Sequence, residues 1–150
     1  MAKKSRSKAE SVENDSINGG KGNVYIVDPK VIEAGGRDSS VLVGSRLCDS
    51  CQTEIDPFQF APKVRFAELV KVVRSHCSNT TQYLDPSLPT LEIAFRLLLL
   101  KGSRPTSLVG IHDQLSAILM NAVWPRYVSG QDLERMLSQD TYYGIVHHLV

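Results

Sequence analysis

Residues 90–102 read TLEIAFRLLLLKG and contain Leu97-Leu98-Leu99-Leu100, an apolar run that no other in the chain exceeds in length. Apolar side chains occupy nearly every side of a helix drawn over residues 91–101, which is typical of a helix buried at the centre of a domain. Thr90 is a suitable N-cap, and Gly102 stands where glycine commonly ends a helix. The run is much shorter than the roughly 20 residues that a membrane-spanning helix needs. The stretch therefore predicts a central buried helix, and we expect no membrane partner.

Helical periodicity continues after this stretch. Apolar side chains recur at helical spacing over residues 107–122, which predicts a second helix. Ser129, with Asp132 three positions later, resembles a capping box and predicts a third helix that ends near residue 138. Residues 142–150 (YYGIVHHLV) have the composition of a β-strand. The sequence therefore predicts three helices followed by a β-strand over residues 90–150.

For two large side chains of this region, burial or exposure is predicted from the neighbouring residues. Trp124 stands next to Pro125, which ends the second helix, and we expect the indole to fill the core. His112, beside Asp113, lies away from the apolar stripe of the second helix, so we expect it to be solvated.

This order of elements resembles a winged-helix domain. The parts that carry the resemblance are the first helix, the turn and the wing: LEIAF at 91–95, RPT at 104–106 and YYGI at 142–145. The resemblance implies a module that binds DNA through its third helix or docks a protein partner. The third helix holds Asp132 and Glu134 with a single basic residue, Arg135, so phosphates would repel it. We therefore expect protein contact rather than duplex binding.

The chain divides into three parts. Residues 1–22 hold only Val12 and Ile17 as sizeable apolar side chains, which predicts a disordered tail. Residues 79–89 (NTTQYLDPSLP) are polar and interrupted by prolines, so they mark the end of a small lobe over residues 23–89 and precede a helical lobe over residues 90–150. The fold class is α+β: a small N-terminal α/β lobe with a Cys-x2-Cys knuckle, then a mainly helical, winged-helix-like C-terminal lobe.

Short elements are expected inside the small lobe. Residues 24–27 (VYIV) and 41–43 (VLV) are β-type runs. Asp28 is a suitable cap for a helical turn that Pro29 would begin. A longer helix is expected over residues 63–76.

The cysteines indicate a metal site. Cys48 and Cys51 form a C-x2-C pair, and the third cysteine of the chain is Cys77. Such a pair can present two thiolates to one zinc ion, which a distant His or Cys then completes. Cys77 is expected as the third ligand, with either His76 or an acid such as Asp56 as the fourth. Adjacent residues rarely reach one metal together, so His76 beside Cys77 requires a kinked helix end.

Two other interpretations of these thiols stay open. A zinc ribbon would need a second C-x2-C pair, which would fall at residues 74–77, but Arg74 stands in place of the first cysteine of that pair. The first alternative is therefore that the thiols are simply buried or exposed and bind no metal. A thiol oxidoreductase would use Cys48 and Cys51 at the start of a helix in a βαβ unit. Pro57 and Pro62 prevent a long helix after Cys51, which weakens the redox interpretation.

The predicted helix over residues 63–76 has one basic face. Its four cations, set against the single acid Glu68, are Lys63, Arg65, Lys71 and Arg74. A solvated face is the ordinary interpretation of such a pattern, and contact with phosphates or an acidic partner is the alternative.

Composition limits the function further. The formal net charge of +1 argues against a strong polyanion binder, and the odd count of 3 cysteines without a secretory leader favours the cytoplasm. No nucleophile or phosphate-binding motif is found. We therefore expect a non-enzymatic cytoplasmic binding or adaptor protein with a structural zinc site and a protein partner. The alternatives are a nucleic-acid-associated accessory factor with weak, salt-sensitive binding, and a thiol oxidoreductase.

Overall fold

The computed structural model describes residues 23–148 and combines short helices with one small sheet. The fold is therefore α+β, as the sequence predicts, while the predicted tail over residues 1–22 lies outside the described residues. The elements are β1 (Val24–Val27), α2 (Pro29–Ala34), α3 (Ser39–Gly44), α4 (Asp49–Glu54), α5 (Arg65–Ser75), the 3-10 turn η1 (Cys77–Asn79), α6 (Thr90–Lys101), β2 (Thr106–Ser107), α7 (Leu108–Leu119), α8 (Gly130–Ser138) and β3 (Ile145–His148).

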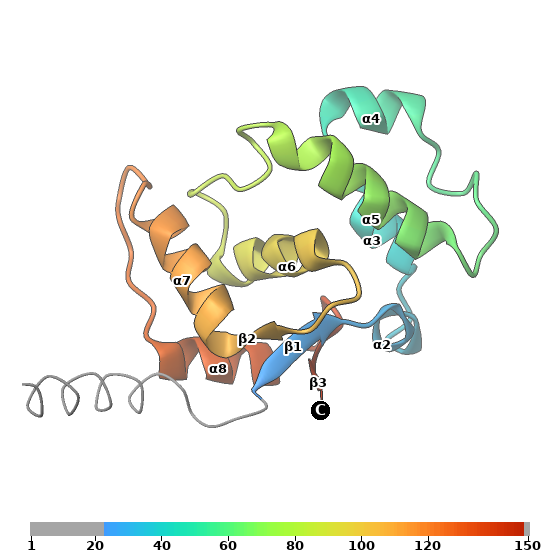
Figure 1. The fold of residues 1–150 in the computed structure, drawn as a ribbon. Coiled ribbons are helices and arrows are strands. Elements are labelled where there is room, and N and C mark those ends of the chain that lie inside the picture. The colour runs from blue at the N-terminus through green and yellow to red at the C-terminus, as the bar shows by residue number, and fades with distance from the viewer. Residues whose placement is uncertain (1–22, 149–150) are drawn as a thin grey trace, which may run out of the picture.

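The predicted central helix is confirmed in α6. Ile93, Phe95 and Leu98 are at most 1% exposed, and Figure 1 shows α6 in the middle of the fold, in contact with α5, α7 and β1. Pro89, rather than Thr90, occupies the N-cap position, and the helix ends at Gly102 with φ of +65°. Only glycine adopts that conformation without strain.

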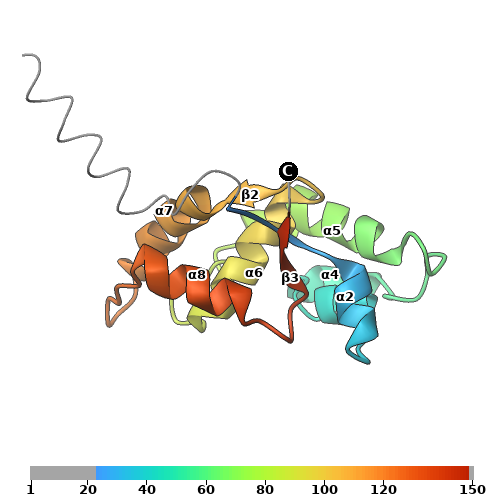
Figure 2. The same cartoon turned by 90° about the horizontal axis from the view of Figure 1, so that it is seen from below.

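The sheet joins the two ends of the described chain. Its order is β2-β1-β3 and both pairings are antiparallel, with Tyr25 opposite Thr106 on one side and opposite His147 on the other. The central strand β1 thus comes from the segment assigned to the small lobe, whereas β2 and β3 come from the segment assigned to the helical lobe. Figure 2 shows β1 and β3 between α8 on one side and α2 on the other. The two segments therefore share one sheet.

The helices after α6 begin as the sequence indicates. The Ser107 side chain accepts a hydrogen bond from the backbone N–H of Gly110 at the start of α7, and Ser129 accepts one from Asp132 at the start of α8. These side chains satisfy N–H groups that have no partner inside the helix.

Three local predictions are wrong. Residues 41–43 are helical because Asp38 caps α3 through the N–H groups of Ser40 and Val41. Trp124 is 84% exposed rather than in the core, and His112 is only 8% exposed rather than solvated. His112 Nε2 donates to the carbonyl oxygen of Val128 at 2.7 Å, which fixes the end of the α7–α8 connection and leaves Trp124 at its outer side.

A buried ion-pair network links the two segments beside the cysteines. Glu92 on α6 accepts hydrogen bonds from Arg46 at 2.7 and 2.9 Å, from Arg96 at 2.7 Å and from the Tyr143 hydroxyl at 2.8 Å. Arg46 lies two residues before Cys48, so the network holds the approach to the C-x2-C turn against the central helix. Among the described residues, none of the helices has the length and apolar character required to cross a membrane.

Candidate metal centre

The C-x2-C turn opens a short helix. Cys48 occupies the N-cap position of α4, with φ of −68° and ψ of 164°, and Cys51 lies in the first turn. The Gln52 side chain donates to the carbonyl oxygens of Leu47 at 2.7 Å and Ser45 at 3.2 Å, which fixes the chain as it enters the turn. Residues three apart lie on the same side of a helix, so the thiols of Cys48 and Cys51 project from the same side of the first turn of α4.

The other two ligands lie where α5 ends. His76 leaves helical geometry, with φ of −130° and ψ of −60°, and Cys77 begins η1. This break turns two sequence neighbours toward one point, which a continuous helix would not do. The requirement for a kinked helix end is therefore met, and both His76 and Cys77 join the site.

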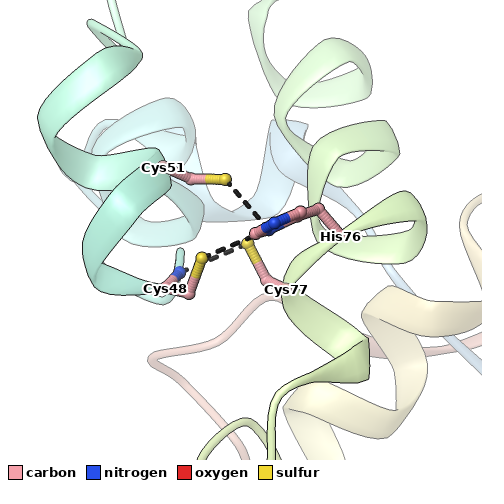
Figure 3. Close-up of side chains that lie close together, drawn as sticks. All are labelled: Cys48, Cys51, His76 and Cys77. Carbon is pink, nitrogen blue, oxygen red and sulfur yellow. Dashed lines mark hydrogen bonds between the residues drawn. The ribbon is translucent and has the colours of Figure 1, made fainter.

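The four side chains converge (Figure 3). Their ligand atoms, one from each of Cys48, Cys51, His76 and Cys77, all lie within 4.8 Å of one another. His76 Nδ1 is 3.3 Å from the Sγ atoms of both Cys48 and Cys51. A tetrahedral zinc ion with ordinary bond lengths would place its sulfur and nitrogen ligands about 3.5 Å apart and its sulfurs about 3.8 Å apart. The spacing therefore fits one metal ion with three sulfur ligands and one nitrogen ligand.

The site lies at the edge of the core. Cys77 is 0% exposed and Cys51 is 8% exposed, Cys48 is half-buried, and His76 is exposed. The backbone N–H of Cys48 donates to Cys77 Sγ at 3.2 Å, and the Ser50 hydroxyl lies 3.4 Å from Cys48 Sγ. Such hydrogen bonds around the ligands orient them and favour their ionised form.

The thiols differ in how readily they ionise. The Ser50 hydroxyl and the backbone N–H of Cys51 lower the pKa of Cys48 to about 6. Burial raises the pKa of Cys51 to about 12 and also raises the pKa of Cys77. Buried thiolates gathered at one point repel each other and need a cation, which is the charge that a bound metal supplies.

The donor set fits a closed metal site. Four protein ligands complete a tetrahedron and leave no position for water or substrate, which is typical of structural rather than catalytic zinc. Three sulfurs and an imidazole nitrogen are compatible with zinc and unsuited to magnesium or calcium, which take oxygen ligands. Asp56, the alternative fourth ligand, lies outside the cluster and accepts a hydrogen bond from the backbone N–H of Phe58 at 2.9 Å.

The four cations of the predicted basic face do not form one surface. Arg65 donates to the carbonyl oxygen of Phe60 at 2.9 Å and lies over the Phe58 ring, and Lys71 pairs with Glu68 at 3.2 Å. Lys63 and Arg65 line one cavity, whereas Lys71 and Arg74 line another. Among the described side chains, Lys63 and Arg74 have no hydrogen-bond or ion-pair partner.

Sequence reasoning missed the residues that support the metal ligands. Ser50 lies inside the C-x2-C loop, and a hydroxyl at that point could have been noted as a donor to a thiolate. Gln52 acts through the carbonyl oxygens of Leu47 and Ser45, and Arg46 acts through the distant Glu92; no sequence motif indicates either contact.

Comparison with known proteins finds no family model, no curated protein and no solved structure that matches the chain. The function must therefore be argued from the residues alone.

Proposed function

We propose that this protein is a non-enzymatic binding protein of the cytoplasm, in which a structural zinc ion joins the C-x2-C turn to the end of α5. The observation that carries the proposal is the convergence of four ligand atoms within 4.8 Å of one another. The three cysteines are free, which agrees with a reducing compartment. Because α4 has only six residues, its packing alone would hold it weakly, and a metal would add the missing constraint.

Metal analysis tests the zinc proposal. Protein purified without added metal should contain about one zinc per chain, measured by plasma mass spectrometry. A chelator that removes the metal should lower the midpoint of thermal unfolding, and zinc but not magnesium should restore it. A metal-free protein with the same unfolding midpoint would contradict the proposal.

The second half of the proposal is a protein partner on the helical, winged-helix-like segment. Its support is an exposed apolar cluster on the α7–α8 connection, with Met120 61%, Val123 89%, Trp124 84% and Tyr127 77% exposed. Aromatic side chains held outward in such a cluster are typical of protein contacts. The charge of α8 supports protein over nucleic acid, because Asp132 and Glu134 outnumber the single basic residue of this helix, Arg135.

A selective capture experiment tests this half. The wild-type chain and Tyr142→Ala, each used to capture binding partners, should enrich the same protein, whereas Trp124→Ala should not. Tyr142 is a suitable control because it is an exposed aromatic residue outside the cluster, at 45%. Equal capture by all three forms would show that the cluster does not bind the partner.

The two alternatives have less support. A nucleic-acid factor would rely on cations of which Arg65 and Lys71 are already engaged, so binding should be weak and lost with salt in a gel-shift titration. A thiol oxidoreductase built on a βαβ unit requires a strand before Cys48, whereas the structure has the helix α3 there. Rapid alkylation of Cys48 in protein as purified would favour the oxidoreductase, whereas alkylation that becomes rapid only after chelation would favour zinc.

A further inference from the structure

A cavity of about 530 Å³ lies on the outer face of the sheet, and none of the four candidate metal ligands lines it. It is bounded by α5, by β1 and β3, and by the turn that follows α6. Its volume falls within the range of roughly 300–1,000 Å³ that small-molecule sites occupy.

The floor and one wall of the cavity are apolar. Ile26 and Val146 are cross-strand partners, so their side chains lie together on one face of the sheet. The opposite face carries Tyr25, which is 1% exposed in the core. Ala67 and Val70 of α5 form the facing wall. The sheet thus presents one apolar face to the core and a second, smaller one to this cavity.

A cation stands at one end of the cavity. Within residues 23–148 the Arg74 guanidinium has no hydrogen-bond or ion-pair partner, and it lies over Gly102. A Cβ atom on Gly102 would come within 3.1 Å of Arg74 Nη1, so the missing side chain makes room for the guanidinium. Ser103 and His148 line the same cavity, and both side chains carry groups that can form hydrogen bonds.

The charges in the cavity are not balanced. Among the described residues that line it, one is acidic: Asp28, whose carboxylate keeps its charge but is directed to α2, where it accepts a hydrogen bond from the backbone N–H of Lys30 at 2.9 Å as the helix cap. Lys71 is held by Glu68 at 3.2 Å. Arg74 is therefore the group left to attract an anion, beside an apolar floor.

We propose that this cavity binds a small organic anion with an apolar body, such as a medium-chain carboxylate. The carboxylate accepts a two-pronged hydrogen bond from the Arg74 guanidinium, a geometry that suits a planar fork of N–H donors. The chain lies on Ile26 and Val146, and its burial supplies the apolar part of the affinity. The residues that line this cavity include none of the four candidate metal ligands and none of the exposed cluster on the α7–α8 connection.

Octanoate titrated into the full chain tests the proposal, with binding followed by calorimetry and by NMR shifts. We expect saturable binding at one site, with the shifts at β1, β3 and α5, and much weaker binding of neutral 1-octanol. Arg74→Gln should weaken octanoate binding about tenfold or more, because a hydrogen bond to a charged group is lost. Ala67→Glu should also abolish binding, because Ala67 is exposed and the new carboxylate would enter the cavity without disturbing the core.

Lys63→Gln is the matched control, since Lys63 precedes the same helix but lines a different cavity. Its octanoate affinity should equal that of wild type. No binding by wild type, equal binding of octanoate by Arg74→Gln, or shifts confined to the Trp124 connection would each overturn the proposal. An equal loss in Lys63→Gln would overturn the assignment of the anion to Arg74.

Discussion

The backbone N–H of Cys48 donates a hydrogen bond to Cys77 Sγ, 3.2 Å away and 29 positions along the chain. This contact joins the first ligand of the C-x2-C turn to the last ligand at the end of α5. Because the donor is a backbone group, the position of Cys77 depends on the conformation of the turn as well as on its own side chain. The turn and the end of α5 are thus joined by one hydrogen bond, to which a bound metal would add further links.

The identity of the fourth ligand can be tested by two matched substitutions. His76→Ala should release the metal or weaken its binding by about tenfold or more, because a three-thiolate site has lost its nitrogen ligand. Asp56→Ala should keep the full metal content, because Asp56 lies outside the cluster. Metal content after dialysis against a weak chelator measures both. Loss of metal in Asp56→Ala alone would reverse the assignment.

Acid should weaken the fold through Glu92. Burial raises the pKa of this carboxyl, but hydrogen bonds from Arg46, Arg96 and Tyr143 outweigh it and lower the pKa from 4.5 to about 2. The folded pKa is below the unfolded one, so the stabilisation is complete above about pH 4.5 and is lost as pH falls toward about 2. A shift of this size corresponds to about 3 kcal/mol.

Chemical unfolding of wild type and Glu92→Gln across this pH range measures the effect. Wild type should be more stable at neutral pH, and the difference between the two proteins should shrink as the pH falls. Release of metal by acid is common to both and cancels in the difference. A difference that stays constant with pH would show that the ionised carboxylate is not the stabilising group.

Two glycines with positive φ should respond differently to alanine. Gly144 has φ of +73°, and a Cβ there would lie 2.5 Å from Ile32 Cγ1 and 2.9 Å from the Asp28 carbonyl oxygen. Gly36 has φ of +85° but nothing within 4 Å of the Cβ position. Gly36→Ala should cost about 1 kcal/mol from its backbone alone. Gly144→Ala should cost more than about 2 kcal/mol, because the clash adds to the backbone strain. Equal unfolding free energies by denaturant titration would contradict the close packing at Gly144.

Alanine substitutions of the exposed Trp124 and of the buried His112 should differ in their effect on the free energy of unfolding. Trp124→Ala should change the free energy of unfolding by less than about 0.5 kcal/mol, as is usual for surface positions. His112→Ala should cost about 1–3 kcal/mol, because the Val128 carbonyl loses its donor in a partly buried position. Denaturant unfolding measures both, and amide exchange should increase in residues 120–128 only in the His112 variant. A large loss of stability in Trp124→Ala would place the indole in the core after all.

The amino-acid sequence alone determined those structural features that depend only on residues close together along the chain. The run over residues 91–101 is predicted to be buried because apolar side chains occupy nearly every side of the helix, and α6 confirms it. Ser129 caps α8 through the N–H group of Asp132, three positions later, as the capping-box pattern predicts. The C-x2-C spacing likewise placed Cys48 and Cys51 at one turn, and the α+β class followed from the alternation of these short patterns.

Tertiary structure decided what depends on distant groups. Residues 41–43 have a β-type composition, but the cap from Asp38 and packing of α3 against α5 make them helical. His112 is buried because the chain returns to place the Val128 carbonyl beside it, and the same return leaves Trp124 outside. His76 and Cys77 both reach the metal centre because α5 breaks at His76, at a point set by the approach of the Cys48 turn. The spacing of residues in a short segment determines which of its side chains lie on the same side. Only the tertiary structure determines which residues from distant parts of the chain contact them.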